Sequence, residues 1–66
     1  MQLWIVGQFR EQTPRGNVWD FQGVFASREL AVAACQSPSY FIAPADLNEP
    51  IPDDAQEWPG CEYPLV

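Results

Sequence analysis

Residues 18–25 read VWDFQGVF, and this stretch decides the predicted fold. Aromatic side chains stand at every second position except one, and this period of two is typical of a strand that buries one face. The rings expected on that face are Trp19, Phe21 and Phe25. Gly23 occupies the remaining position, where a glycine indicates a bulge or the close approach of another element.

The preceding segment, residues 2–10 (QLWIVGQFR), is rich in β-branched and aromatic residues and predicts a second strand. We expect the two strands to pair as an antiparallel hairpin. Residues 11–17 (EQTPRGN) connect them, and the length of this segment predicts a loose loop rather than a tight two-residue turn. The expected core face of the first strand comprises Leu3, Ile5 and Phe9. Trp4 lies on the other face, where it is either covered by the C-terminal tail or exposed to a partner.

A short helix is expected after the hairpin. Ser27 is a favourable N-cap, and Glu29 falls in the first turn, where a negative charge interacts well with the helix dipole. Residues 30–36 (LAVAACQ) favour a helix, which Ser37-Pro38 ends because the residue before a proline disfavours helical backbone. The residues expected to face the sheet are Leu30, Ala33 and Ala34, with Val32 left open.

Residues 40–43 (YFIA) predict a third strand that Pro44 ends, and the chain changes character from residue 45 onward. Five of the seven prolines lie between positions 44 and 64, which disfavours regular helix and central strands there. One helical turn over residues 53–57 and a short edge strand over residues 62–66 are expected. Apolar anchors predict that this tail wraps over the core in an ordered way; they are Leu47, Ile51, Trp58, Tyr63 and Leu65.

The predicted fold class is therefore α+β, a small antiparallel sheet of three or four strands with one central α-helix packed on one face. The 66 residues form one domain, with a sheet–helix core over residues 1–44 and an acidic, proline-rich wrap over residues 45–66. A chain of this size buries only about 60% of its unfolded surface. Large aromatic side chains must therefore supply much of the core.

Charge is distributed unevenly along the chain. All three basic residues lie within the first 28 positions, whereas seven of the nine acidic residues follow Arg28. The net charge of −6 repels nucleic acids and anionic membranes and attracts basic surfaces. We therefore expect a basic protein as the partner, with no direct binding to nucleic acid or to a membrane.

Enzymatic activity is not expected, because the chain has no His and no Lys from which to build a Ser-His, Cys-His or Ser-Lys arrangement. Cys35 and Cys61 alone do not make a zinc site, and whether they pair in a disulfide stays open. Asp53, Asp54 and Glu57 are interpreted as a solvated acidic turn rather than a metal site, and no cofactor is expected. The sequence shows no signal peptide and no membrane-spanning stretch, which predicts a cytoplasmic protein.

The pattern W-D-F-x-G-V-F-A-S-x-E-x-A-x-A-A-C spans residues 19–35, and Y-F-I-x-P and W-P follow at residues 40–44 and 58–59. In these motifs, in length and in acidity, the chain resembles small acidic anti-CRISPR proteins of phages and mobile elements, in particular inhibitors of type I-C systems. The resemblance implies a monomer that mimics double-stranded DNA at the DNA-recognising subunit of a type I-C Cascade complex. It implies acidic contact residues and carries over no catalytic residue.

Two modes of binding follow from these observations. In the first, the protein is a DNA mimic whose carboxylates occupy a basic groove; the candidates are Asp46, Glu49, Asp53, Asp54, Glu57 and Glu62, with Glu29 and Asp20. An extended tail would spread its acids over roughly 55 Å, whereas DNA carries one charge per ~1.7 Å. The mimic therefore requires the tail to fold back and gather them. In the second mode, this protein is an accessory protein that docks on a host protein through the exposed rings of Trp4, Trp58 and Tyr63.

Overall fold

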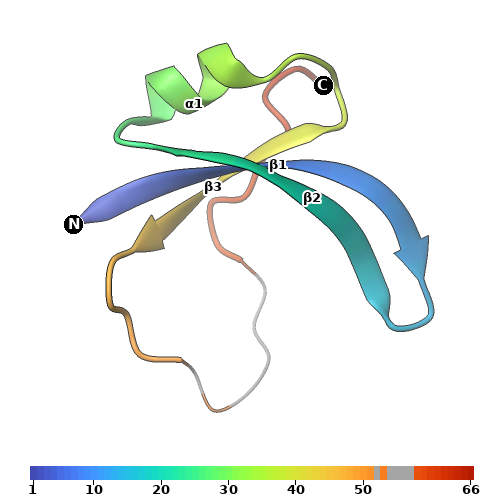
Figure 1. Ribbon diagram of the computed structural model, residues 1–66, viewed down its shortest axis with the longest axis horizontal. Coiled ribbons are helices and arrows are strands. Elements are labelled where there is room, and N and C mark those ends of the chain that lie inside the picture. Colours follow the sequence, from blue (N-terminus) through green and yellow to red (C-terminus); the bar gives the residue numbers. More distant parts are fainter. Residues whose placement is uncertain (52, 54–57) are drawn as a thin grey trace.

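The computed structural model describes residues 1–51, 53 and 58–66, and it confirms the predicted α+β fold (Figure 1). Three strands, β1 (Gln2–Thr13), β2 (Gly16–Phe25) and β3 (Tyr40–Asp46), form an antiparallel sheet in the order β2-β1-β3. One helix, α1 (Arg28–Ala34), packs on one face of this sheet. The segment that follows β3 extends on the side of the sheet away from α1 (Figure 1).

The β1–β2 hairpin closes in a tight turn at Pro14 and Arg15, so the predicted loose loop is wrong. The two strands stay paired as far as Thr13 and Gly16. The Thr13 hydroxyl donates to the Gly16 carbonyl (2.7 Å) and accepts from the Arg15 N–H (3.2 Å). Gly16 has a φ of 124°, which glycine adopts without a steric penalty. These hydrogen bonds within the turn, together with Gly16, allow the two strands to stay paired over residues that were expected to form a longer loop.

A bulge in β2 divides the hairpin into two halves. Val6 pairs with Gly23, but the next residue of β1, Gly7, pairs with Phe21. Gln22 is therefore an extra residue without a partner in β1, and it shifts the side-chain alternation of β2 by one position. Gly23 lies directly beside this bulge, which confirms the interpretation of that glycine.

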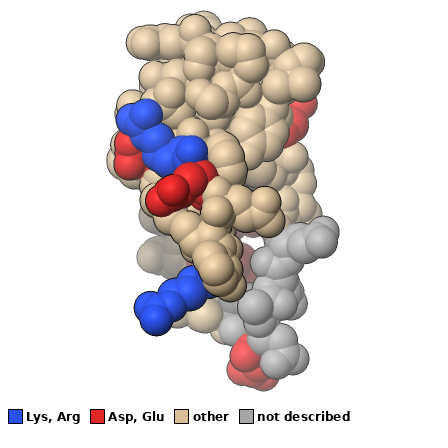
Figure 2. Space-filling view, turned by 90° about the vertical axis from the view of Figure 1, so that its right-hand side faces the viewer, with Lys and Arg blue, Asp and Glu red and all other residues tan. Residues whose placement is uncertain are grey.

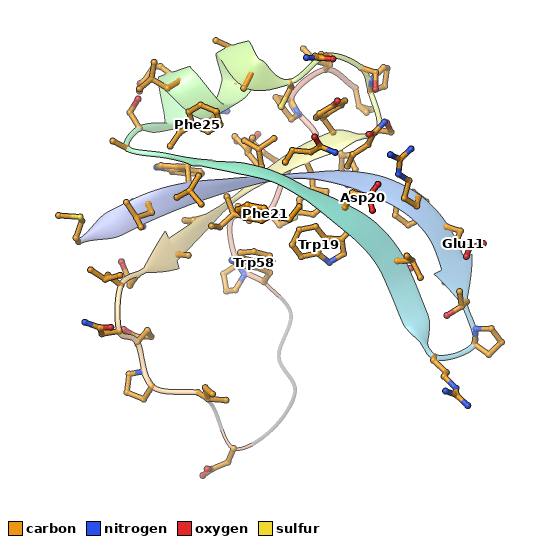
Figure 3. The ribbon with its side chains drawn as sticks, viewed as in Figure 1. Glu11, Trp19, Asp20, Phe21, Phe25 and Trp58 are labelled. Atoms are coloured by element: carbon orange, nitrogen blue, oxygen red, sulfur yellow. The ribbon has the colours of Figure 1, made fainter. Side chains whose placement is uncertain are left out.

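The bulge places the rings of β2 on different faces, so the prediction that they share one face is wrong. Phe25 packs against the core beneath α1, whereas Trp19 contacts Phe41 on the opposite face. Figure 3 shows Phe25 beside the helix and Trp19 and Phe21 projecting from the other side of the sheet. The helix starts three residues after Phe25, and it therefore packs on the face of the sheet to which Phe25 points.

The main core consequently lies on the opposite face of β1 from the one predicted. Val6 (1% exposed) and Ile42 (fully buried) lie beneath α1, and Ala31 of α1, also fully buried, packs against them. Trp4 packs against this cluster. The residues predicted as the core face of β1 lie on the side away from the helix and are partly buried there; they are Leu3, Ile5 and Phe9.

The helix begins at the predicted N-cap. Ser27 has an extended backbone, and its Oγ accepts a hydrogen bond from the Leu30 N–H (3.3 Å). Glu29 lies in the first turn, as expected. The helix ends at Ala34, with Cys35 as its C-cap, two residues before the predicted end at residue 36.

The residues that the helix turns toward the sheet are only partly those predicted. Ala31 is its buried residue, and Val32 and Cys35 pack against the same core. Leu30 is 55% exposed, and Ala33 is also exposed. Because the cap at Ser27 fixes the phase of the helix, this buried stripe runs through positions spaced by four residues, from Ala31 to Cys35.

Strand β3 runs through Pro44 to Asp46, so the predicted end at Pro44 is wrong. On its outer edge Ile42 exchanges two backbone hydrogen bonds with Glu62 (2.8 and 2.9 Å). Pro44 shares the alternation of Ile42, so its missing N–H also belongs to the outer edge, where a proline costs no bond to β1. The expected edge strand over residues 62–66 is reduced to this single bridge.

The predicted anchors of the tail divide into two groups. Trp58 and Tyr63 pack against rings of the sheet. The other anchors are far more exposed: Leu47 is 56%, Ile51 91% and Leu65 46% exposed. Of the helical turn predicted over residues 53–57, all but Asp53 lies outside the described residues.

Candidate functional site

Aromatic side chains gather on the face of the sheet opposite α1. The ring of Phe41, from β3, is at the centre and is 5% exposed. Its centroid lies 5.1 Å from that of Trp19 and 5.7 Å from that of Tyr63. Trp58 tilts against Trp19 at 6.3 Å. We call this surface the open face and define it by Trp19, Phe21, Phe41, Trp58 and Tyr63.

The outer rings of the open face are in contact with solvent. Phe21 is 61% exposed, Tyr63 41%, and Trp19 and Trp58 38% each. Beside the rings of Trp19, Trp58 and Tyr63 lies a hollow of about 180 Å³, which is also lined by Phe9, Asn17, Phe41 and Cys61. Exposed apolar surface of this kind marks interaction sites more often than isolated exposed residues do. The open face is rich in aromatic residues, which are also enriched at the centres of protein–protein interfaces.

Two features of the backbone position these rings. At Gly7 the absent side chain leaves space for the rings above it: a Cβ there would lie 2.5 Å from Cζ of Phe41 and 2.6 Å from Cε3 of Trp19. The indole Nε1 of Trp58 donates a hydrogen bond to the Pro44 carbonyl (2.6 Å). The open face is therefore held in one arrangement without a partner, which lowers the entropy that binding costs.

The aromatic surface predicted from the sequence is only partly the one observed. Trp58 and Tyr63 belong to the open face, but Trp4 packs against the core beneath α1. Trp19 and Phe21 were assigned by their pattern to the core, and the structure exposes both. The signal for their position was the Gln22-Gly23 pair, because a bulge at this point turns the residues before it to the other face.

Two of the predicted acidic contacts are already paired within the protein. Arg10 Nε donates to Asp20. Arg28 donates to Glu62 Oε1 through Nη2 (2.7 Å) and Nε (2.9 Å), which ties the C-terminal segment to the start of α1. Blue and red side chains stand side by side in Figure 2, and the acidic groups do not merge into one patch on that face. Asp20 and Glu62 are therefore less available to a partner than unpaired carboxylates.

The remaining candidate acids lie in different places. Asp46 and Glu49 line one hollow of about 500 Å³ together with Trp58, and Asp53 is exposed in the segment beyond them. Glu29 is exposed in the first turn of α1 and does not line this hollow. Asp54 and Glu57 fall outside the described residues. The described structure thus brings Asp46 and Glu49 together and keeps Glu29 apart from them.

The two cysteines are free, and they belong to different faces of the sheet. Cys35 packs against the core beneath α1, and its Sγ donates to the Ala31 carbonyl (3.4 Å). Cys61 lines the hollow of the open face. Within residues 1–51, 53 and 58–66, no group of three or more His, Cys, Asp or Glu is arranged to hold a metal ion. Over the same residues, no helix has the length and apolar character needed to cross a membrane.

Burial and, secondarily, the charge of Glu62 raise the pKa of the Cys61 thiol. A raised pKa lowers the fraction of reactive thiolate at neutral pH. We therefore expect Cys61 to react with iodoacetamide more slowly at pH 7 than the same cysteine in the unfolded chain, and its rate to rise only at pH values above the ordinary pKa of a thiol. Mass spectrometry of the alkylated peptides measures this rate. A rate at pH 7 equal to that in urea contradicts the prediction.

In a comparison with known proteins, no family model, no curated protein and no solved structure matches this chain. The site must therefore be interpreted from its own chemistry. It consists of an aromatic face with a hollow, beside a second hollow that carries two carboxylates.

Proposed function

We propose that this chain is a non-enzymatic binding protein that docks on a basic surface of another protein through the open face. The observation that carries this proposal is the exposure of four large rings on one face, from 38% for Trp19 and Trp58 to 61% for Phe21. Trp and Tyr contribute most to binding energy at interfaces when a partner excludes water from them. In the free protein Phe41 packs against Trp19 and Tyr63, and Pro44 accepts a hydrogen bond from Trp58.

The charge of the molecule selects the kind of partner. The net charge is −6, and two of the three arginines are engaged with Asp20 and Glu62. A basic surface is therefore attracted from a distance and an acidic one is repelled, which affects the association rate more than the final affinity. Docking through rings and attraction through carboxylates are compatible because different residues supply them.

The proposed target is the DNA-recognising subunit of a type I-C Cascade complex in the cytoplasm of a bacterial host cell, with the protein acting as a monomeric inhibitor. What supports this target is the resemblance of residues 19–35, 40–44 and 58–59 to small acidic anti-CRISPR proteins. A subunit that recognises DNA presents the basic surface that this chain attracts.

DNA mimicry is the second candidate for the mode of binding. It is favoured by the seven acidic residues that follow Arg28 without any basic residue among them. Because Glu62 and Asp20 are occupied by arginines, this mode depends on Glu29, Asp46, Glu49 and Asp53 among the described candidate acids. The aromatic mode instead predicts that carboxylates assist the approach and that rings hold the complex.

The test is capture of a purified type I-C Cascade complex by the immobilised protein at about 50 and about 500 mM salt, with duplex DNA as competitor. We expect capture that weakens less than about tenfold over this range, because apolar contacts are not screened. A steep loss at high salt together with displacement by DNA would instead establish DNA mimicry. No capture at either salt concentration contradicts the proposed target.

A further inference from the structure

Trp58 lies between two hollows, and only one of them belongs to the open face. It lines the aromatic hollow together with Trp19 and Tyr63. It also lines the larger hollow of about 500 Å³ at the end of β3, together with Asp46 and Glu49. The bond from its Nε1 to the Pro44 carbonyl (2.6 Å) fixes the indole in this position. One rigid aromatic ring therefore stands beside two carboxylates in the same concave site.

This combination of groups suits a cationic side chain. The face of an indole attracts a cation through its quadrupole, and tryptophan is the strongest of the aromatic residues in this respect. Carboxylates beside it accept charge-assisted hydrogen bonds from the same cation. A guanidinium group matches both features, because it is planar, stacks on rings and presents its donors in a fixed fork. A lysine ammonium offers neither the plane nor the fork.

No arginine of the chain itself serves these carboxylates. Arg10 is engaged with Asp20 and Arg28 with Glu62. Arg15 lies in the hairpin turn at the far end of β1, since Thr13 pairs with Gly16 there while Gln2 pairs with Asp46 at the other end. The length of β1 separates these ends by a distance on the order of 30 Å. A cation for this hollow must come from another molecule.

We propose that the hollow formed by Trp58, Asp46 and Glu49 receives an arginine side chain of the protein partner. The guanidinium stacks on the indole and donates to the two carboxylates. This inference rests on the proposed function, because it assumes a basic protein partner, and it adds the chemical identity of one contact. The open face would then bury apolar surface of the partner, while the adjacent hollow fixes the register of the complex on one arginine.

The test uses the whole chain and a probe that carries a single guanidinium. N-acetyl-L-arginine amide is titrated into the 15N-labelled protein, and the indole N–H signal of Trp58 is followed by NMR. N-acetyl-L-citrulline amide, which replaces the guanidinium with a neutral urea of the same shape, is the matched ligand control. We expect saturable shifts with a dissociation constant in the millimolar range for the arginine probe, and at least about tenfold weaker binding of the citrulline probe.

Variants test the two carboxylates. Asp46→Asn combined with Glu49→Gln keeps the side-chain shapes, and we expect it to weaken the binding of the arginine probe about tenfold. Glu29→Gln, which lies in the first turn of α1 and outside the lining of this hollow, should leave the binding of the arginine probe unchanged. Equal binding of both probes, an absence of saturable shifts at Trp58, or an effect of Glu29→Gln equal to that of the double variant would overturn the inference.

The same titration separates this inference from the proposed function, because it contains no partner protein. Arginine binding at Trp58 without capture of a Cascade complex supports the hollow and contradicts the target. Capture of the complex without arginine binding supports the proposed function and overturns the inference.

Discussion

Gly7→Ala is expected to lower the free energy of unfolding by about 1–3 kcal/mol, the usual cost of adding a methyl group to a filled site. The new Cβ would lie 2.5 Å from Cζ of Phe41 and 2.6 Å from Cε3 of Trp19. Phe41 has little freedom to move, because it is 5% exposed and packs between Trp19 and Tyr63. The strain must therefore displace the rings that build the open face.

A lower free energy of unfolding for Gly7→Ala is the opposite of what the intrinsic preferences of alanine and glycine predict. An alanine normally stabilises a strand relative to glycine by roughly 0.5–1 kcal/mol, because it restricts the unfolded chain. Gly23→Ala is the matched control: it lies in the neighbouring strand, and its nearest contact would be Cε2 of Phe25 at 3.3 Å. Urea unfolding followed by tryptophan fluorescence compares the two variants. If Gly7→Ala is as stable as the original protein, the close packing of Phe41 and Trp19 over Gly7 is wrong.

Local patterns in the sequence predicted the elements of this fold. The period of two in residues 18–25 marked β2, and Ser27 marked the start of α1 through a hydrogen bond that spans three residues. Such features depend on neighbours in the chain. They are therefore visible without knowledge of the tertiary structure.

The faces of the elements were harder to predict, and the bulge at Gln22 explains most of the errors. A single extra residue reverses the alternation of a strand. Phe25 therefore points to the helix while Trp19 and Phe21 point away from it. Gly23 indicated an irregularity, but the sequence does not state which residue is extra. That depends on pairing with β1, where Gly7 admits the rings of Trp19 and Phe41.

The candidate site also depends on contacts between residues that are distant in the chain. Trp58 bonds to Pro44 across 14 residues, and Arg28 bonds to Glu62 across 34. The first contact positions a ring of the open face. The second neutralises an acid that the charge pattern had assigned to a partner. A count of acidic residues predicts attraction to basic surfaces, but it cannot show which carboxylates are already paired.

Phe21→Ser is expected to weaken binding to the Cascade complex by about 30-fold or more, which corresponds to the loss of a hot-spot residue. Phe21 is the most exposed ring of the open face, at 61%, so little of its side chain contributes to the core. The fold should survive, and circular dichroism with urea unfolding checks this. Serine removes the apolar area that a partner would bury.

Leu30→Ser is the matched control for this variant. Leu30 is 55% exposed, a value close to that of Phe21, but it lies on α1, on the other side of the sheet. Both variants remove an exposed apolar side chain and leave the net charge unchanged. A difference between them therefore reports the face through which the protein docks.

The most direct test of docking through the open face is the dissociation constant of the original protein, Phe21→Ser and Leu30→Ser for a purified type I-C Cascade complex, measured under identical conditions. We predict a loss of about 30-fold or more for Phe21→Ser and a change of less than about threefold for Leu30→Ser. Unchanged binding of Phe21→Ser, or an equal loss in both variants, would contradict docking through the open face.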